Sequence, residues 1–524
     1  MGAPLDDQVL QARVLAFLGD PRTHRGATVR RIDTHASSIF LAGERALKIK
    51  RAIRLPYLDY STLPLRKAAC EAELAINKPN APQIYRRVVA IMQNANGRFE
   101  IAGRGTPVEW ALEMARFDET KTLDRIAREQ PIDAGLAVAM ADAILRSHRA
   151  ADRSQAPWPE SIPTLIARNT EKFRSVQGLQ DAQIDHLDAL SLAAFNRVHD
   201  ILTKRRMDGF VRRCHGDLHL ANIVLIDGCP VLFDAIEFDP AMATTDVLYD
   251  LAFPVMDLLY FGRTEAANIV LNRYLSEADE ANLDGLSAFP LFLSIRAAIR
   301  ANVLFTQAER SADQQAYGRA RKYLSLAGDL IAPTSPRLIA IGGTSGTGKS
   351  VLARALASRI DPAPGAVILR SDVIRKKMFS AEETAPLPAE AYQPKVSRQV
   401  YDDLVMAAAR VLKQGFSVIV DAAYLREDER DVLARVALES KVRFDGLFLR
   451  ADLATRLSRI AARRNDASDA NAEVARLQEH HDIGALKDWA VIDASGSPQQ
   501  TLAASIAKLE LQPGSRSTAA GPHR

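Results

Sequence analysis

Residues 343–350 read Gly343-Thr344-Ser345-Gly346-Thr347-Gly348-Lys349-Ser350. This run matches the G-x-x-x-x-G-K-[ST] pattern of a phosphate-binding loop, and it lies between an apolar segment at 338–341 and a predicted helix. Glycines let backbone N–H groups turn toward a phosphate, and the start of the helix adds the positive end of its dipole. We therefore expect all eight residues to bind the phosphates of a nucleotide, with Lys349 on the β- and γ-phosphates and the Ser350 hydroxyl on Mg²⁺.

After residue 336 the sequence alternates short apolar segments with helical stretches. The apolar segments are 338–341, 367–369, 418–420 and 447–449. This alternation predicts a doubly wound parallel sheet wrapped by helices, which is the α/β class. Ligands bind at the carboxyl ends of the strands in such sheets, so the polar residues that follow these segments are candidates for the site.

Two aspartates occupy such positions. Asp421 could hold Mg²⁺, and Ala422 stands where hydrolytic motors usually carry a glutamate that activates water, so a kinase is favoured over a motor. Asp372 is our candidate for the base that accepts a proton from an acceptor hydroxyl. Ser371 or Asp372 could instead cap the following helix, and the sequence leaves both interpretations open.

Three arginines, Arg456, Arg459 and Arg463, recur at spacings of three and four on a predicted helix. They would share one face of that helix and repel one another unless an anion neutralises them. Together with Arg464 they could close over the phosphates as a lid, and we expect Arg463 to bind the nucleotide. A solvated basic face is the alternative.

These motifs make residues 337 to about 500 resemble the small P-loop kinase family that includes phage polynucleotide kinase, zeta toxins and gluconate kinase. The shared elements are GTSGTGKS at 343–350, LRSDVIRK at 369–376, VIVDA at 418–422 and the arginine-rich helix. The resemblance implies ATP and Mg²⁺ as the nucleotide and the metal. It also implies that the adenine lies against the late loop 495–498.

A second constellation lies in the N-terminal half. Residues 215–222 read His215-Gly216-Asp217-Leu218-His219-Leu220-Ala221-Asn222, which has the H-x-D-x-x-x-x-N spacing of a kinase catalytic loop. In such loops the aspartate accepts the acceptor proton, while the asparagine and a later aspartate hold Mg²⁺. Asp217, Asn222 and Asp234 are predicted to fill these roles. A metal site of His215, His219 and Asp217 would need further ligands that no upstream spacing supplies, so His215 is interpreted as a brace for the loop.

This loop resembles that of the aminoglycoside phosphotransferase family, which shares the protein-kinase fold, and the resemblance extends over most of residues 25–330. It implies a bilobal α+β domain with a mixed lobe followed by a mainly helical lobe, and it implies that Asp250 is a structural support. The family also requires a lysine on an N-lobe strand and a glutamate on the next helix. Lys48 and Glu73 are the expected pair, although Lys50 lies on the same strand face and Glu71 is an alternative to Glu73.

The sequence departs from protein kinases in one respect. No G-x-G-x-x-G covers the phosphates, and the corresponding loop at 34–38 offers hydroxyl and N–H groups instead. The segment 109–117 is expected to be the hinge that contacts adenine. No acidic cluster suited to an aminoglycoside is identifiable, so the residues do not support an aminoglycoside as acceptor.

A chain of 524 residues is too long for one hydrophobic core. The prolines at 333 and 336 mark the clearest boundary. We predict a kinase-like domain at 1–332, a linker at 333–336, a P-loop domain at 337–511 and a disordered tail at 512–524.

The charge balance is nearly even, because 68 Lys and Arg residues exceed 64 Asp and Glu residues by 68 − 64 = 4. No strong field attracts nucleic acid or a membrane, so we expect neither as a partner. Three scattered cysteines form no disulfide or metal pattern, and no signal peptide or uncharged membrane-spanning stretch is recognisable. We expect a cytoplasmic protein, and the sequence makes no prediction of its oligomeric state.

Three functions remain open. The leading prediction is a bifunctional phosphotransferase in which each domain transfers the γ-phosphate of ATP to a hydroxyl of a small molecule. The first alternative is a single P-loop kinase regulated by an N-terminal domain that senses a nucleotide or ligand. A polynucleotide-end kinase ranks last, because it predicts a basic stripe with stacking aromatic residues, and only 6% of the residues are aromatic.

Overall fold

The computed structural model describes residues 5–55, 58–463 and 466–511, and the predicted disordered tail at 512–524 lies outside them. The chain divides into two compact units. The first comprises Met1–Ile162 and Thr203–Asp257, and the second comprises Pro163–Leu202 and Leu258–Arg524. The second unit therefore contains helices from upstream of the predicted linker as well as the phosphate-binding loop. The domain limits inferred from the sequence remain a prediction.

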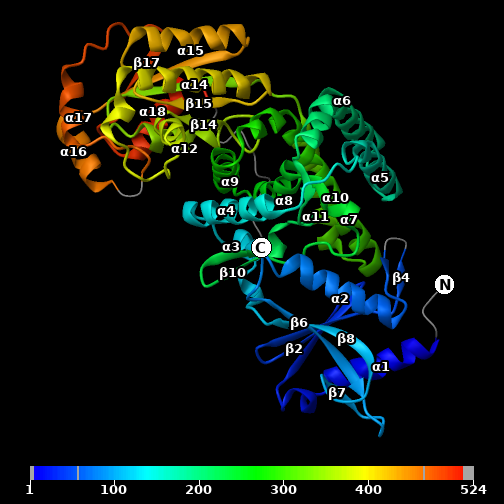
Figure 1. The fold of residues 1–524 in the computed structure, drawn as a ribbon. Helices are drawn as coiled ribbons and strands as arrows, with labels where there is room; N and C mark the ends of the chain where they lie inside the picture. Colours follow the sequence, from blue (N-terminus) through cyan, green and yellow to red (C-terminus); the bar gives the residue numbers. More distant parts are fainter. Residues whose placement is uncertain (1–4, 56–57, 464–465, 512–524) are drawn as a thin grey trace. The chain divides into compact units, whose positions relative to one another are not determined.

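The first unit contains a six-stranded antiparallel sheet in the order β1-β2-β3-β8-β6-β7, drawn in blue to cyan in Figure 1. Alternating side chains fill a core on each face. Phe40 and Leu47 pack with helix α1 (Leu5–Gly19), whereas Leu41 and Ala46 point to the opposite core. The strands are β1 (Val29–Asp33), β2 (Ser37–Ala42), β3 (Arg45–Lys50), β6 (Tyr85–Gln93), β7 (Phe99–Ile101) and β8 (Thr106–Ala115).

Helix α2 (Leu63–Asn77) packs against β8 and β6. Its buried side chains include Arg66, Cys70, Glu73 and Asn77, which recur at spacings of four, three and four and therefore lie on one face. This periodicity turns Glu73 toward the sheet, where β3 carries the two candidate lysines.

The predicted catalytic loop connects short strands. These are β9 (Val211–Arg213), β10 (Ile223–Ile226), β11 (Cys229–Leu232) and β12 (Thr244–Asp246). Strands β10 and β11 form a hairpin after the loop, and β12 pairs with β9 before it. Helix α8 (Val247–Tyr260) starts directly after β12, which places Asp250 in its first turn.

The second unit contains nearly all of α5 (Ile162–Ser175) and most of α6 (Asp181–Met207), whose last residues belong to the first unit. Its further helices include α9 (Thr264–Glu277), α10 (Phe289–Ser311) and α11 (Gln314–Ile331). Helices α10 and α11 pack along each other. Among the described residues, one helical segment, Glu280–Ser311, is long and apolar enough to cross a membrane by length and composition. Most of its apolar window, 72%, is buried inside the protein, as in the core helix of a globular domain.

The second unit also contains a five-stranded parallel sheet in the order β14-β15-β13-β16-β17, drawn in yellow to red in Figure 1. Its strands are β13 (Arg337–Gly343), β14 (Val367–Arg370), β15 (Val418–Asp421), β16 (Arg443–Arg450) and β17 (Trp489–Asp493). The helices are α12 (Lys349–Ala357), α13 (Ser371–Met378), α14 (Pro394–Lys413), α15 (Glu427–Glu439), α16 (Leu453–Ala462), α17 (Ala472–Leu477) and α18 (Pro498–Lys508). The chain places β14 and β15 on one side of β13 and β16 and β17 on the other. The order of the strands therefore changes direction beside β13, the strand that leads into the phosphate-binding loop. The predicted doubly wound α/β part and the mixed kinase-like part are both confirmed.

Candidate active sites

The phosphate-binding loop turns sharply between β13 and α12. Gly343, Gly346 and Gly348 have φ angles of 131°, 86° and 94°, a region that side chains rarely adopt. A methyl group at Gly346 would also lie 2.7 Å from the carbonyl oxygen of Arg456, and one at Gly343 would lie 2.5 Å from that of Leu449. The loop therefore requires glycine at 343 and 346 for both conformation and space, and at 348 for conformation.

Lys349 and Ser350 are the first residues of α12, and their side chains meet the end of β15. Lys349 Nζ donates to the Thr344 carbonyl at 3.2 Å, and Ser350 Oγ donates to Asp421 Oδ2 at 2.5 Å. Burial lowers the pKa of Lys349, and the cations Arg463 and Arg370 add to that effect. A phosphate would relieve this cost. The Ser350 and Asp421 oxygens form the hard-ligand pair that Mg²⁺ prefers.

Asp372 lies in the first turn of α13, at the end of β14. No side chain among the described residues caps this helix, so the capping role left open by the sequence is not seen for Ser371 or Asp372. Burial raises the pKa of Asp372, and the carboxylate of Asp421 raises it further. A carboxylate with a raised pKa is suited to accept a proton, which agrees with the role predicted for it.

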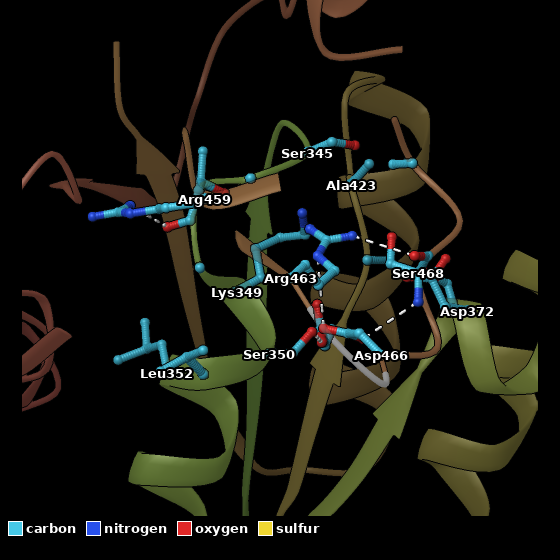
Figure 2. Close-up of a pocket in the computed structure, with 18 of the residues that line it drawn as sticks. Ser345, Lys349, Ser350, Leu352, Asp372, Ala423, Arg459, Arg463, Asp466 and Ser468 are labelled. Atoms are coloured by element: carbon cyan, nitrogen blue, oxygen red, sulfur yellow. Dashed lines mark hydrogen bonds and ion pairs between the residues drawn. The ribbon is translucent and has the colours of Figure 1, made fainter. Parts of the chain in front are cut away.

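These groups line one cavity of about 840 Å³. Figure 2 draws Lys349, Ser350 and Arg463 in its middle, with Asp372 and Ser468 on one side of the view and Arg459 on the other. Further lining residues come from α13, from α14 and the segment before it, from the segment after α16 and from the start of α18; among them are Arg375, Tyr392, Tyr401, Asp466, Asp469, Asn471, Pro498 and Leu502. The predicted adenine loop at 495–498 therefore borders the same cavity through Pro498.

The three arginines do not act as one face. Arg456 is buried and pairs with Glu479, so it holds α16 against the segment after α17. Arg459 donates to the carbonyl oxygens of Ala494 and Gly496, each at 2.7 Å. Arg463 lies just beyond α16 and faces the cavity. Arg459 and Arg463 both line the cavity, Arg456 does not, and Arg464 lies outside the residues that the structure describes. The lid expected from the sequence therefore stays a prediction.

Sequence reasoning missed several residues of this site. Gln478 accepts a hydrogen bond from the Ser345 backbone N–H at 2.7 Å, a group of the phosphate-binding loop. Arg370, at the end of β14, lies between Asp421 at 3.4 Å and Asp466 at 2.7 Å. Arg370 stands beside Asp372 in the sequence and could have been suspected. Gln478 and Asp466 belong to no recognisable motif.

Asp250 holds the candidate catalytic loop of the first unit through hydrogen bonds to its backbone. Its carboxylate accepts hydrogen bonds from the backbone N–H groups of His215 at 3.3 Å and Gly216 at 2.9 Å. His215 Nε2 lies 2.9 Å from the Phe233 carbonyl, and burial lowers the pKa of His215, so the ring is neutral at physiological pH. These contacts agree with the bracing roles expected for His215 and Asp250.

The described residues contain a group of candidate metal ligands that differs from the set of His215, His219 and Asp217 considered from the sequence. It consists of His148, Cys214 and Asp250, whose ligand atoms lie within 4.8 Å of one another. Burial raises the pKa of the Cys214 thiol well above its usual value, which keeps the thiol protonated and a poor ligand.

Asp217 and buried Asn222 are in contact within this loop, and Asp234, which follows β11, contacts Lys48. Asn222 Nδ2 donates to the Asp217 carbonyl at 2.9 Å and lies 3.4 Å from its carboxylate. The side chains of Asp217 and Asp234 are 42% and 46% exposed, so both carboxylates are accessible to a ligand. Carboxylate and amide oxygens in this arrangement are suited to Mg²⁺.

Both lysines of β3 contact Glu73, which is fully buried. Lys48 Nζ lies 2.7 Å from Glu73 Oε1 and 2.8 Å from Asp234 Oδ1, whereas Lys50 Nζ lies 2.6 Å from Glu73 Oε2 and also pairs with Glu237. Burial alone would lower the pKa of Lys48, but the carboxylates of Asp234 and Glu73 outweigh it and raise that pKa well above its usual value. Lys48 therefore faces the candidate metal ligand, and Lys50 faces the protein interior.

Several polar groups in the predicted phosphate loop at 34–38 and the predicted hinge at 109–117 form hydrogen bonds or ion pairs within the protein. In the loop at 34–38, the Thr34 hydroxyl accepts from the Ser37 N–H at 2.9 Å, and the Ser38 hydroxyl donates to Asp33 at 2.6 Å. In the predicted hinge, Glu109 is buried and binds Arg66 at 2.9 Å. The loop hydroxyls and Glu109 thus have structural partners, and the nucleotide contacts predicted for these segments stay predictions.

Comparison with solved structures finds kinases among the similar proteins. A gluconokinase from Sinorhizobium meliloti 1021 is 20% identical and covers 33% of this chain and 92% of its own, with a TM-score of 0.25. A choline/ethanolamine kinase family protein from Mesorhizobium loti is 12% identical and covers 62% and 99%, with a TM-score of 0.37. An ethanolamine kinase from Plasmodium vivax is 11% identical and covers 57% and 82%, also with a TM-score of 0.37.

Relatives of nearly full length are known. Uncharacterized proteins of Mycobacterium bovis and Mycobacterium tuberculosis are each 27% identical over 458 residues, which is 84% of this chain and 88% of theirs. Two family models match separate regions: that of the phosphotransferase enzyme family matches residues 94–286, and that of an AAA domain matches residues 338–482. The chain is therefore a kinase-type phosphotransferase in which one region matches the phosphotransferase enzyme family and a second region, which contains the P-loop, matches an AAA domain.

Proposed function

We propose that the protein is a bifunctional ATP-dependent kinase in which each half transfers the γ-phosphate of Mg-ATP to a hydroxyl group of a small molecule. The observation that carries this proposal is the cavity beside the phosphate-binding loop, where Lys349, Ser350, Asp421 and Asp372 converge. Candidate phosphate ligands, candidate metal ligands and a candidate base thus surround one space large enough for a nucleotide and a small acceptor.

In the P-loop half, the loop amides and Lys349 would bind the β- and γ-phosphates, and Ser350 and Asp421 would hold Mg²⁺, which neutralises phosphate charge when bound. The acceptor oxygen forms a bond to the γ-phosphorus as the bond from that phosphorus to the β,γ-bridging oxygen breaks. Asp372 takes the proton of the acceptor hydroxyl, and ADP leaves with the bridging oxygen. The raised pKa of Asp372 favours this proton transfer.

In the other half, Asp217 would accept the acceptor proton, and Asn222 and Asp234 would hold Mg²⁺. Lys48 would bind the nucleotide phosphates while Glu73 fixes its position. The exposure of both aspartates supports this assignment, because a structural carboxylate would be buried among partners, as Asp250 is. The chemistry of this loop indicates a hydroxyl group as the acceptor. The proposal names no particular acceptor compound for this half.

The two sites can be separated in the full-length protein. Purified wild type, Lys349→Ala, Asp217→Asn and the double variant would be incubated with terminally labelled ATP and a metabolite extract, and the labelled products would be compared. Lys508→Ala and Asp227→Asn are matched controls, since both side chains are exposed and away from the two sites.

Each single variant is expected to remove a different set of products, and the double variant should remove both. Products that persist in the double variant would contradict the proposal. If Asp217→Asn leaves every product unchanged and Lys349→Ala removes them all, the first half senses a ligand and does not catalyse. Labelled nucleic acid as the main product would instead indicate a polynucleotide-end kinase.

A further inference from the structure

Helix α9 lies upstream of the predicted linker, yet it pairs with the edge strand of the P-loop sheet. Asn272 Oδ1 accepts from the Ile368 N–H at 2.7 Å, and Asn272 Nδ2 donates to the Ala366 carbonyl at 3.1 Å. Asn268 Nδ2 donates to the same carbonyl at 3.1 Å. The two amide side chains thus satisfy backbone groups on the open side of β14, as a neighbouring strand would.

The next residue of α9 continues this contact with charge. Arg273 Nη1 lies 3.1 Å from Glu383 Oε2, and the other oxygen of Glu383 lies 3.4 Å from Arg370 Nη1. Arg370 is the last residue of β14, so the asparagines and Arg273 act on the same strand. Glu383 therefore bridges an arginine from upstream of the linker to an arginine of the site.

Arg370 presents each of its three nitrogens to a different carboxylate. Nε lies 3.4 Å from Asp421, Nη2 lies 2.7 Å from Asp466 and Nη1 faces Glu383. Its side chain is only 11% exposed, so water screens these interactions weakly. A cation this close to Asp421 competes with any metal that binds that carboxylate, and the competition weakens as other carboxylates neutralise the guanidinium.

We propose that Arg273 is a positioning residue of the P-loop site: by fixing Glu383 it holds Arg370 in place and so limits the competition of Arg370 with Mg²⁺ for Asp421. The inference rests on the proposed binding of Mg-ATP by this half. It makes the P-loop site dependent on a helix that belongs, by sequence, to the preceding half.

The test measures the binding of a fluorescent non-hydrolysable ATP analogue at increasing Mg²⁺ concentrations. The signal that remains in the Lys349→Ala variant is subtracted, so that only binding to the P-loop site is counted. Arg273→Ala and Glu383→Gln should each raise the Mg²⁺ concentration for half-maximal binding roughly two- to fivefold, the range for partly exposed ion pairs. Binding without Mg²⁺ should not weaken, because an Arg370 less neutralised by Glu383 attracts phosphate at least as well. The double variant should shift the requirement no further than the larger single effect.

Asp284→Asn is the matched control. Asp284 pairs with Arg410 at 2.6 Å and joins the same upstream region to α14, but it does not reach Arg370. It should leave the Mg²⁺ requirement unchanged, and Arg273→Lys should restore part of the wild-type requirement. Melting temperatures without nucleotide would be recorded for every variant.

An unchanged Mg²⁺ requirement in Arg273→Ala and Glu383→Gln, despite normal wild-type binding, would overturn this inference alone. An equal shift in Asp284→Asn, or a loss of binding both with and without Mg²⁺, would show that α9 only supports the fold. If Arg273→Ala does not fold, Glu383→Gln carries the same test. No Lys349-dependent binding in the wild type would overturn the proposed function and this inference with it.

Discussion

Replacing Lys50 by methionine is expected to destabilise the first unit much more than the same replacement at Lys48. The Lys50 side chain is 2% exposed and is held by Glu73, by Glu237 and by the ring of Tyr60, whose centroid lies 5.3 Å away. Its loss leaves Glu237 buried without its cation. Breaking a buried ion pair from one side costs about 3–5 kcal/mol.

Lys48 lies in a more open position, with 12% of its side chain exposed. Its loss frees Asp234, which is near the surface and regains water, while Glu73 keeps its contact with Lys50. We expect a cost of about 1.5–3 kcal/mol, the range for hydrogen bonds to charged groups. A difference of about 2 kcal/mol corresponds to about 4–8 °C in melting temperature for a domain of this size.

The assay is thermal unfolding of the full-length protein without nucleotide, combined with hydrogen–deuterium exchange of peptides from β3 and α2 so that the change is assigned to the first unit. Nucleotide binding to the first unit would be measured in the Lys349→Ala background. Lys48→Met should abolish that binding, and Lys67→Met is the control, since Lys67 forms a surface pair with Glu71. The reasoning is refuted if Lys48→Met destabilises as much as Lys50→Met, or if Lys50→Met loses binding at unchanged stability.

Three further changes have expected outcomes. Lys349→Ala should abolish the ATP-induced rise in melting temperature of the second unit without lowering its melting temperature in the absence of nucleotide; retained stabilisation by ATP would contradict its role. Asp372→Asn should cut phosphate transfer by about 10²–10⁴-fold with ATP binding intact. Wild-type transfer should fall with decreasing pH through a pKa above the ordinary value near 3.9, because the base must be ionised. Since the folded state binds this proton more tightly than the unfolded chain, Asp372 costs stability at neutral pH, and a variant that melts lower would point to a structural role. Asp217→Asn should slow transfer while Mg-ATP still binds, whereas Asp234→Asn should weaken Mg-ATP binding; equal effects on both steps would contradict the separate roles.

The sequence alone was sufficient to predict those features whose chemistry depends on residues that are neighbours in the chain. The loop at 343–350 binds phosphate through consecutive backbone groups, so its spacing specifies both its conformation and its position between a strand and a helix. The strands predicted at 338–341, 367–369 and 418–420 appear at those places, because strands of a parallel sheet covered by helices on both faces are buried on both faces and read as short continuous apolar runs. Each extends by one to three residues beyond the predicted limits.

The choice among neighbouring charges was decided only by the tertiary structure. Lys48 and Lys50 are equivalent by alternation on β3, and they differ because Asp234 approaches one and Glu237 the other. Arg456 and Arg463 are spaced so that they would lie on one face of a helix. In the structure Arg456 is buried and pairs with Glu479, whereas Arg463 lines the cavity. A side chain's partner depends on segments that are remote in sequence, and no local pattern contains that information.

The same reason explains why the sequence could not show which upstream residues contact the P-loop sheet. Prolines at 333 and 336 indicate a break in regular structure, and they do so correctly between α11 and β13. The sequence could not show that α9, some sixty residues earlier, supplies Asn272 and Arg273 to the edge of the P-loop sheet. Linker composition is a local property of the chain, whereas the pairing of a sheet edge depends on which polar groups folding brings within hydrogen-bond distance of it.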